Sequence, residues 1–73
     1  MTVTLFARYR GDIKQVTMPA STTVVYAAKR VAEAFGHDPE QWWGLVHKDG
    51  RDLSQEGLVE FLHDMVVDLV REG

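Results

Sequence analysis

The sequence predicts an α+β fold in which one helix packs across a mixed, mostly antiparallel sheet. Three observations predict it: two extended apolar runs open the chain, a single helical stripe follows, and further extended runs close it. The 73 residues fit one domain over 1–73, with a short C-terminal tail at 71–73. The predicted order of elements is therefore ββαββ.

The first part of the chain predicts a β-hairpin. Apolar and polar residues alternate over 3–9, which is the period of a strand with one buried face. Residues 10–12 (Arg-Gly-Asp) are turn material, and 13–18 resume extended character with Val16 and Met18 on one face. Pro19 ends the second strand because proline cannot donate to a ladder of hydrogen bonds.

The next segment predicts one helix of about a dozen residues. The hydroxyls of residues 21–23 can accept hydrogen bonds from the free N–H groups of a helix start. Gly36 is the expected left-handed stop, with Pro39 just beyond it. One apolar stripe follows the helical period and consists of Val24, Ala27, Ala28, Val31, Ala34 and Phe35.

The second half of the chain predicts more strands and one short turn of helix. Leu58, Phe61 and Leu62 are spaced as a single apolar turn packed on the core. A crossing helix lets the first and last strands pair in parallel at the sheet centre, which is the β-grasp arrangement. Three segments have strand character: 42–47, a short fourth strand beginning at 52–53 after the Asp-Gly turn, and 65–70.

Composition excludes several classes of function. Cysteine is absent and the formal charge is −3 without a dense basic cluster, so disulfides, thiolate metal sites and nucleic-acid binding are not expected. No apolar run approaches a membrane span, and the first residues lack the pattern of a signal peptide, which predicts a cytoplasmic protein without a membrane partner. His37, His47 and His63 are too scattered for a metal site. No nucleophile has a base placed beside it, so we expect no catalytic residues, no bound cofactor and no enzyme.

Several motifs together resemble the ubiquitin family, and the resemblance is to its bacterial members in particular. Met1 opens directly into a strand, and Gly11 and Pro19 stand in the first turn and at the junction with the helix. The helix ends at Gly36, and Pro-Glu-Gln at 39–41 precedes the third strand. The segments Asp-Gly-Arg-Asp-Leu (49–53) and Leu-Val-Glu-Phe-Leu-His-Asp (58–64) are similar to the turn and pre-strand segments of that family.

The resemblance implies a protein modifier whose C-terminal glycine, here Gly73, becomes conjugated to target amines through an isopeptide bond. In that family an activating enzyme adenylates the glycine with ATP, a conjugating enzyme transfers it to target proteins, and a deconjugating protease removes it. Arg71 and Glu72 are then the residues of tail recognition, although Glu72 stands where the family has a second glycine. A glycine suits activation because a side chain would obstruct the approach of the nucleophile.

A partner-binding patch is expected on the sheet. Side chains alternate in a strand, so we predict Trp43 and Leu45 inward, and Trp42 and Val46 outward. Phe6 joins the same patch from the first strand, and tryptophan is enriched at binding hot spots. The resemblance implies that partners dock on this sheet face. The candidate acceptor lysines for self-conjugation are Lys14, Lys29 and Lys48.

Two other functions remain open at this point. The missing second glycine and the short tail favour a non-covalent β-grasp binding module, similar to the small ubiquitin-like component of some bacterial secretion systems. A sulfur carrier, with a thiocarboxylate on its last glycine, is the third. Sequence features alone do not choose among them.

Overall fold

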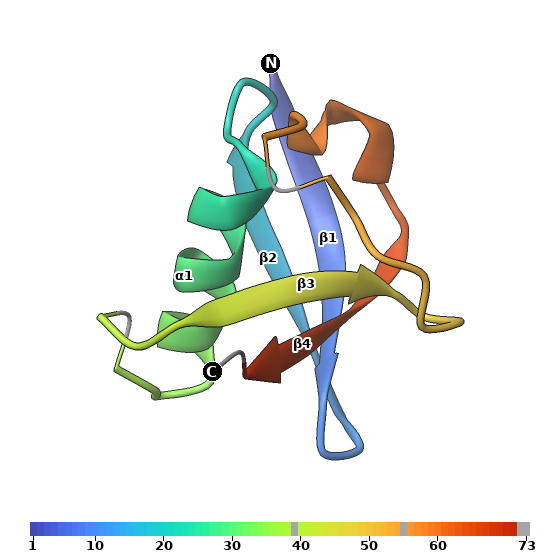
Figure 1. The fold of residues 1–73 in the computed structure, drawn as a ribbon. Coiled ribbons are helices and arrows are strands. Elements are labelled where there is room, and N and C mark those ends of the chain that lie inside the picture. Colours follow the sequence, from blue (N-terminus) through green and yellow to red (C-terminus); the bar gives the residue numbers. More distant parts are fainter. Residues whose placement is uncertain (39, 55, 72–73) are drawn as a thin grey trace.

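A computed structural model describes residues 1–38, 40–54 and 56–71. Within them, one sheet of four strands has the spatial order β2-β1-β4-β3, and one helix lies across it (Figure 1). The elements in chain order are β1 (Thr2–Tyr9), β2 (Asp12–Pro19), α1 (Val24–Ala34), β3 (Trp43–His47), the 3₁₀ turn η1 (Val59–Leu62) and β4 (Val66–Arg71). The predicted α+β architecture is confirmed.

The hairpin of β1 and β2 has a two-residue turn. Tyr9 pairs with Asp12, and the pairing continues to Thr2 and Pro19. The turn residues Arg10 and Gly11 have φ of 50° and 86°, as a type I′ turn requires at both central positions. Its backbone twist matches the right-handed twist of the strands, which is why a glycine stands in this turn.

The strands β1 and β4 pair in parallel at the centre of the sheet, as predicted. Phe6 lies opposite Val66 and Arg8 opposite Asp68, while β3 runs antiparallel along the other side of β4. The parallel pairing requires the chain to cross from one end of the sheet to the other, and α1 makes this crossing (Figure 1). The predicted inward positions of Trp43 and Leu45 are confirmed, since both are buried.

The helix begins and ends on local signals. Thr23 is the N-cap, and its hydroxyl accepts a hydrogen bond from the Tyr26 N–H at 3.4 Å. At the other end, Gly36 has φ of 82°; its N–H and that of His37 each donate at 2.9 Å to carbonyls of the last turn, those of Glu33 and Ala32. This is a Schellman motif, which satisfies carbonyls that the helix leaves free. Pro39 lies outside the described residues.

One position of the predicted helical stripe is wrong. Ala34 is exposed, and Ala32 is buried instead. At about 100° per residue, Ala32 lies next to Ala28 on the stripe, whereas Ala34 falls at its margin. The helix therefore buries Val24, Ala27, Ala28, Val31 and Ala32 against the sheet.

The expected fourth strand beginning at 52–53 is also wrong, because Asp52 forms an isolated bridge with Val46 and the described residues that follow it form no strand before β4. After the turn, the chain lies beside the end of β3 for one residue, where the His47 N–H donates a hydrogen bond to the Arg51 carbonyl at 2.9 Å. The chain then leaves for the start of α1, where Leu58 forms a second isolated bridge with Thr23. The final strand is thus β4, and it extends through Arg71, one residue further than predicted.

The apolar turn at 58–62 is confirmed as an element, but its orientation differs from the prediction. Val59 and Leu62 are buried, whereas Phe61 is 77% exposed. A 3₁₀ helix has three residues per turn, so residues three apart lie on one side, and Val59 and Leu62 occupy the inner one. Leu58 and Phe61 therefore share the outer side. No helix in the described part of the chain is long and apolar enough to cross a membrane.

Candidate protein-docking face

The outer face of the sheet, turned away from α1, carries half-buried apolar side chains. Burial alternates along β1 and β4, so residues on either side of each buried position face outward. Phe6 lies opposite Val66, and Val46 lies opposite Asp68 on the other side of β4. We call the following residues the sheet-face patch: Phe6, Val46, Val66 and Val70, with the ion pair of Arg8 and Asp68.

Arg8 and Asp68 form a two-pronged ion pair at the middle of this patch. The Arg8 Nε donates to Asp68 Oδ1 at 2.6 Å, and the second nitrogen, Nη2, donates to Oδ2 at 2.9 Å. The same Nη2 also donates to the Lys48 carbonyl at 3.4 Å, which ties the turn after β3 to the sheet. The hydrogen bond and the charge of Asp68 raise the pKa of Arg8 above its ordinary value. Both charges are thus internally compensated, and their planar geometry fixes the two side chains.

Sequence reasoning missed the ion pair. Arg8 and Asp68 are 60 residues apart in the chain, and only the parallel register of β1 and β4 makes them neighbours. The available signal was that two central strands each carry one charged residue of opposite sign at an outward position. To predict that Arg8 and Asp68 pair, one must know how β1 and β4 are aligned, and the alternation of side chains alone does not specify this alignment.

The predicted patch of Trp42, Val46 and Phe6 is brought together only in part. Phe6 and Val46 lie on the same outer face, on either side of β4. Trp42 lies outside β3, which begins at Trp43, and is 75% exposed. Four residues of strand span about 13 Å, so Trp42 lies well away from Val46, at the end of the sheet where β4 finishes.

The candidate lysines lie on different elements, and Arg71 is the one tail residue that the structure describes. Arg71 belongs to β4 and pairs with Trp43, while Glu72 and Gly73 lie outside the described residues. Lys14 on β2 has its ammonium 5.7 Å from the centre of the Phe35 ring. Lys29 lies on α1 and Lys48 in the turn after β3, and both are exposed. All three lysines are thus accessible.

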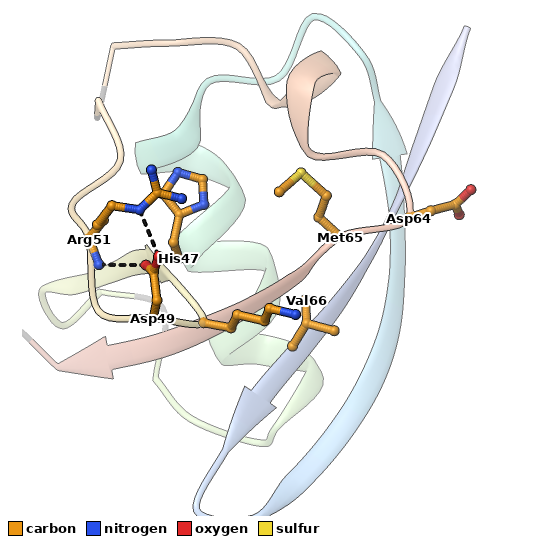
Figure 2. A pocket seen from close by; sticks show the side chains of 7 residues that line it. His47, Asp49, Arg51, Asp64, Met65 and Val66 are labelled. Atoms are coloured by element: carbon orange, nitrogen blue, oxygen red, sulfur yellow. Dashed lines mark hydrogen bonds and ion pairs between the residues drawn. The ribbon is translucent and has the colours of Figure 1, made fainter.

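A hollow of about 270 Å³ lies beside the sheet-face patch (Figure 2). One wall is the turn from His47 to Arg51, and the other is the segment from Asp64 to Val66. In the turn, Arg51 donates to the Asp49 carboxylate from its backbone N–H at 3.1 Å and from Nε at 2.8 Å. These interactions, the backbone hydrogen bond first, lower the pKa of Asp49. Asp49 is therefore held as a structural carboxylate of the turn.

The three histidines make different contacts. His37 stacks on Trp43 with ring centres 4.8 Å apart, and His47 lines the hollow. His63 accepts a hydrogen bond at Nδ1 from the Thr4 N–H at 3.3 Å, and its Nε2 lies 3.4 Å from Asp64. Within residues 1–38, 40–54 and 56–71, no group of three or more histidine and carboxylate side chains could hold a metal ion.

Comparisons with known proteins rest on structure alone, since no family model and no curated protein matches the sequence. One similar structure is a chain of the pParkin–pUb–UbcH7 complex, 15% identical over 97% of this chain, with a TM-score of 0.74. This chain spans 23% of the length of that one.

Two further structures match over nearly their whole length. A designed protein based on ubiquitin is 18% identical over 99% of this chain and 90% of its own, with a TM-score of 0.72. The EccD5 ubiquitin-like domain from Mycobacterium xenopi is 12% identical over 100% of this chain and 99% of its own, with a TM-score of 0.63. At these identities the likenesses concern the fold, and they confirm the predicted β-grasp.

Proposed function

We propose that this chain, which has the ubiquitin-like β-grasp fold, is a protein modifier that partner proteins recognise through the sheet-face patch. The observation that carries the proposal is the set of half-buried apolar side chains around the compensated Arg8–Asp68 pair. A partner that covers this face removes apolar surface from water without desolvating an unpaired charge. The chain is then handled by enzymes and is not itself one.

The covalent step of this proposal takes place at Gly73. An activating enzyme adenylates the glycine carboxylate with ATP and releases pyrophosphate. An enzyme thiol then displaces AMP to form a thioester, which passes to the conjugating enzyme, and an amine of the target displaces the thiol to form an isopeptide bond. Arg71 and Glu72 are the tail residues that these enzymes contact, and Lys14, Lys29 and Lys48 are accessible acceptors for chains of the modifier. A deconjugating protease reverses the bond, and the setting is the cytoplasm.

Mass spectrometry of target proteins tests the covalent step. Trypsin cuts after Arg71, so a conjugated target carries a Glu-Gly remnant on the modified lysine. We expect this remnant in cells that contain the partner enzymes, and its loss when Gly73 is deleted. Absence of the remnant from denatured, affinity-purified material would refute conjugation. A free chain heavier by the mass difference between sulfur and oxygen would instead indicate a sulfur carrier.

Two valine-to-serine substitutions, one on the sheet-face patch and one on α1, test the docking face separately. Val46→Ser removes an apolar group from the patch, and we expect about tenfold weaker partner binding. Val25→Ser is the matched control, because Val25 is 40% exposed on α1, away from the sheet's outer face. Equal binding by both variants, each shown to be folded by circular dichroism, would remove the sheet face from the proposal.

A non-covalent binding module is the second candidate. It is favoured by the likeness to the EccD5 ubiquitin-like domain over the whole length of both chains, and by the exposed ring of Trp42. Under this alternative, deletion of Gly73 leaves partner binding intact, while Trp42→Ala weakens it. Loss of function on deletion of the glycine alone would contradict it.

A further inference from the structure

Phe61, in the 3₁₀ turn η1, has a highly exposed aromatic side chain. Among the exposed large apolar residues of the described chain, Met1 alone is more exposed. Phe61 is 77% exposed and Leu58, three residues earlier, is 38% exposed. The turn that presents them is rigid, since Val59 and Leu62 are buried and Val59 N–H donates to the Thr22 carbonyl at 2.9 Å. Large apolar side chains held in water by a fixed element are typical of binding sites.

The chain segment that contains Phe61 is acidic, with His63 as its one basic side chain. Residues 52–64 contain four of the eleven acidic residues and none of the eight lysines and arginines. These acids, Asp52, Glu56, Glu60 and Asp64, are all exposed. Ion pairing among the described residues leaves Glu56 and Glu60 without a cation. We call Leu58 and Phe61, together with Glu56 and Glu60, the η1 surface.

The hollow shown in Figure 2 takes its second wall from the segment that follows η1, beginning at Asp64. Asp64 lines it, but the opposite wall carries the cations Lys48 and Arg51. Asp64 thus lies across the hollow from these cations, whereas Glu56 and Glu60 have no cation partner among the described residues. The η1 surface lies at the end of the molecule where β1 begins, whereas the sheet-face patch lies along the middle of β1 and β4 (Figure 1).

We propose that the η1 surface docks a basic amphipathic segment of a partner protein. Apolar side chains of that segment cover Phe61 and Leu58, and its lysines or arginines pair with Glu56 and Glu60 at the rim. Opposite charges across an interface speed association and select the partner, while the aromatic anchor supplies the affinity. The inference does not depend on the sheet-face patch or on Gly73, so this chain would present two independent protein contacts.

A helical peptide with leucine on one face and lysine on the other is the probe, titrated into the isotope-labelled full chain. We expect amide shifts in the nuclear magnetic resonance spectrum centred on residues 56–64, and binding that weakens as salt rises. Phe61→Ser weakens binding about 30-fold. Glu60→Lys, which leaves Glu56 as the one negative charge beside a new positive one, also weakens it and removes most of the preference for lysine over glutamate in the peptide. Ile13→Ser is the matched control, since it removes another exposed apolar side chain, at the opposite end of the hairpin from the start of β1.

Several outcomes would overturn the proposal. These are no binding, shifts centred on the sheet-face patch, equal binding by Phe61→Ser, or equal binding of a scrambled peptide of the same charge. Shifts at Phe61 that depend on protein concentration without any peptide would assign the surface to a second copy of the chain instead. Both variant positions are exposed, and retained spectral dispersion shows that each variant is folded.

Discussion

Truncation of two neighbouring apolar residues, Leu62 and Phe61, should have very unequal effects on stability. Leu62 is 3% exposed, and Leu62→Ala removes about three methylene equivalents from the core. Their transfer to water accounts for about 2.4 kcal/mol, and a residual cavity raises the cost to about 3–4 kcal/mol. Phe61→Ala, at a position 77% exposed, should change the free energy of unfolding by no more than about 0.5 kcal/mol.

Urea and thermal unfolding, followed by circular dichroism, measure this difference. A domain of this size has about 4–11 kcal/mol of stability, so Leu62→Ala removes a large fraction of it. Its melting temperature should fall by at least about 12 °C, whereas that of Phe61→Ala should stay within about 4 °C of the parent. Comparable losses from the two variants would show that both side chains pack inside, as the sequence pattern predicts. The assignment of an outer side to η1, and the docking proposal with it, would then be refuted.

Three further predictions concern turns and charges. Gly36→Ala places a side chain at φ of 82° in open space, so only conformational strain opposes it. We expect the free energy of unfolding, measured with urea, to fall by about 1 kcal/mol. An unchanged free energy of unfolding would contradict the Schellman motif at the end of α1. Arg51→Ala should raise the pKa of Asp49 part of the way to its ordinary value, because the backbone donor remains. A lowered carboxylate pKa means that its contribution to stability is present above the ordinary aspartate pKa and is lost as the pH falls through the lowered one; carboxyl carbon titration by nuclear magnetic resonance checks the shift. Exchange of the central pair, Arg8→Asp with Asp68→Arg, should restore part of the stability and partner binding lost in either single variant, and a double-mutant cycle with no coupling would argue against a paired role.

Much of the fold is predictable because its signals are local. The hairpin follows from alternation over 3–9 and 13–18 with a glycine in the turn, and the helix from its apolar stripe between Thr23 and Gly36. Each of these elements satisfies its own backbone hydrogen bonds within a few residues of sequence. The β-grasp order then follows from the few ways in which one helix can connect a hairpin to later strands.

The candidate site was predicted less well because it depends on register. Phe6 and Val46 were placed correctly on the outer face, but Trp42 was assigned to a strand that begins one residue later. The charged pair at the centre of the patch, Arg8 and Asp68, exists only because β1 and β4 are aligned with Phe6 opposite Val66. A shift of this alignment by one residue would turn every side chain of one strand to the opposite face.

Residues 58–62 show most clearly which features follow from the local sequence and which depend on contacts between distant segments. The spacing of Leu58, Phe61 and Leu62 is enough to predict an apolar helical turn against the core, and such a turn is present. Which side of it faces inward depends on the bridge between Leu58 and Thr23 and on the hydrogen bond from Val59 to Thr22, contacts that no local pattern contains. Elements thus follow from hydrogen bonds and periodicity within a dozen residues, whereas exposure follows from packing between distant segments. That packing leaves Phe61 in water and makes it available to a partner.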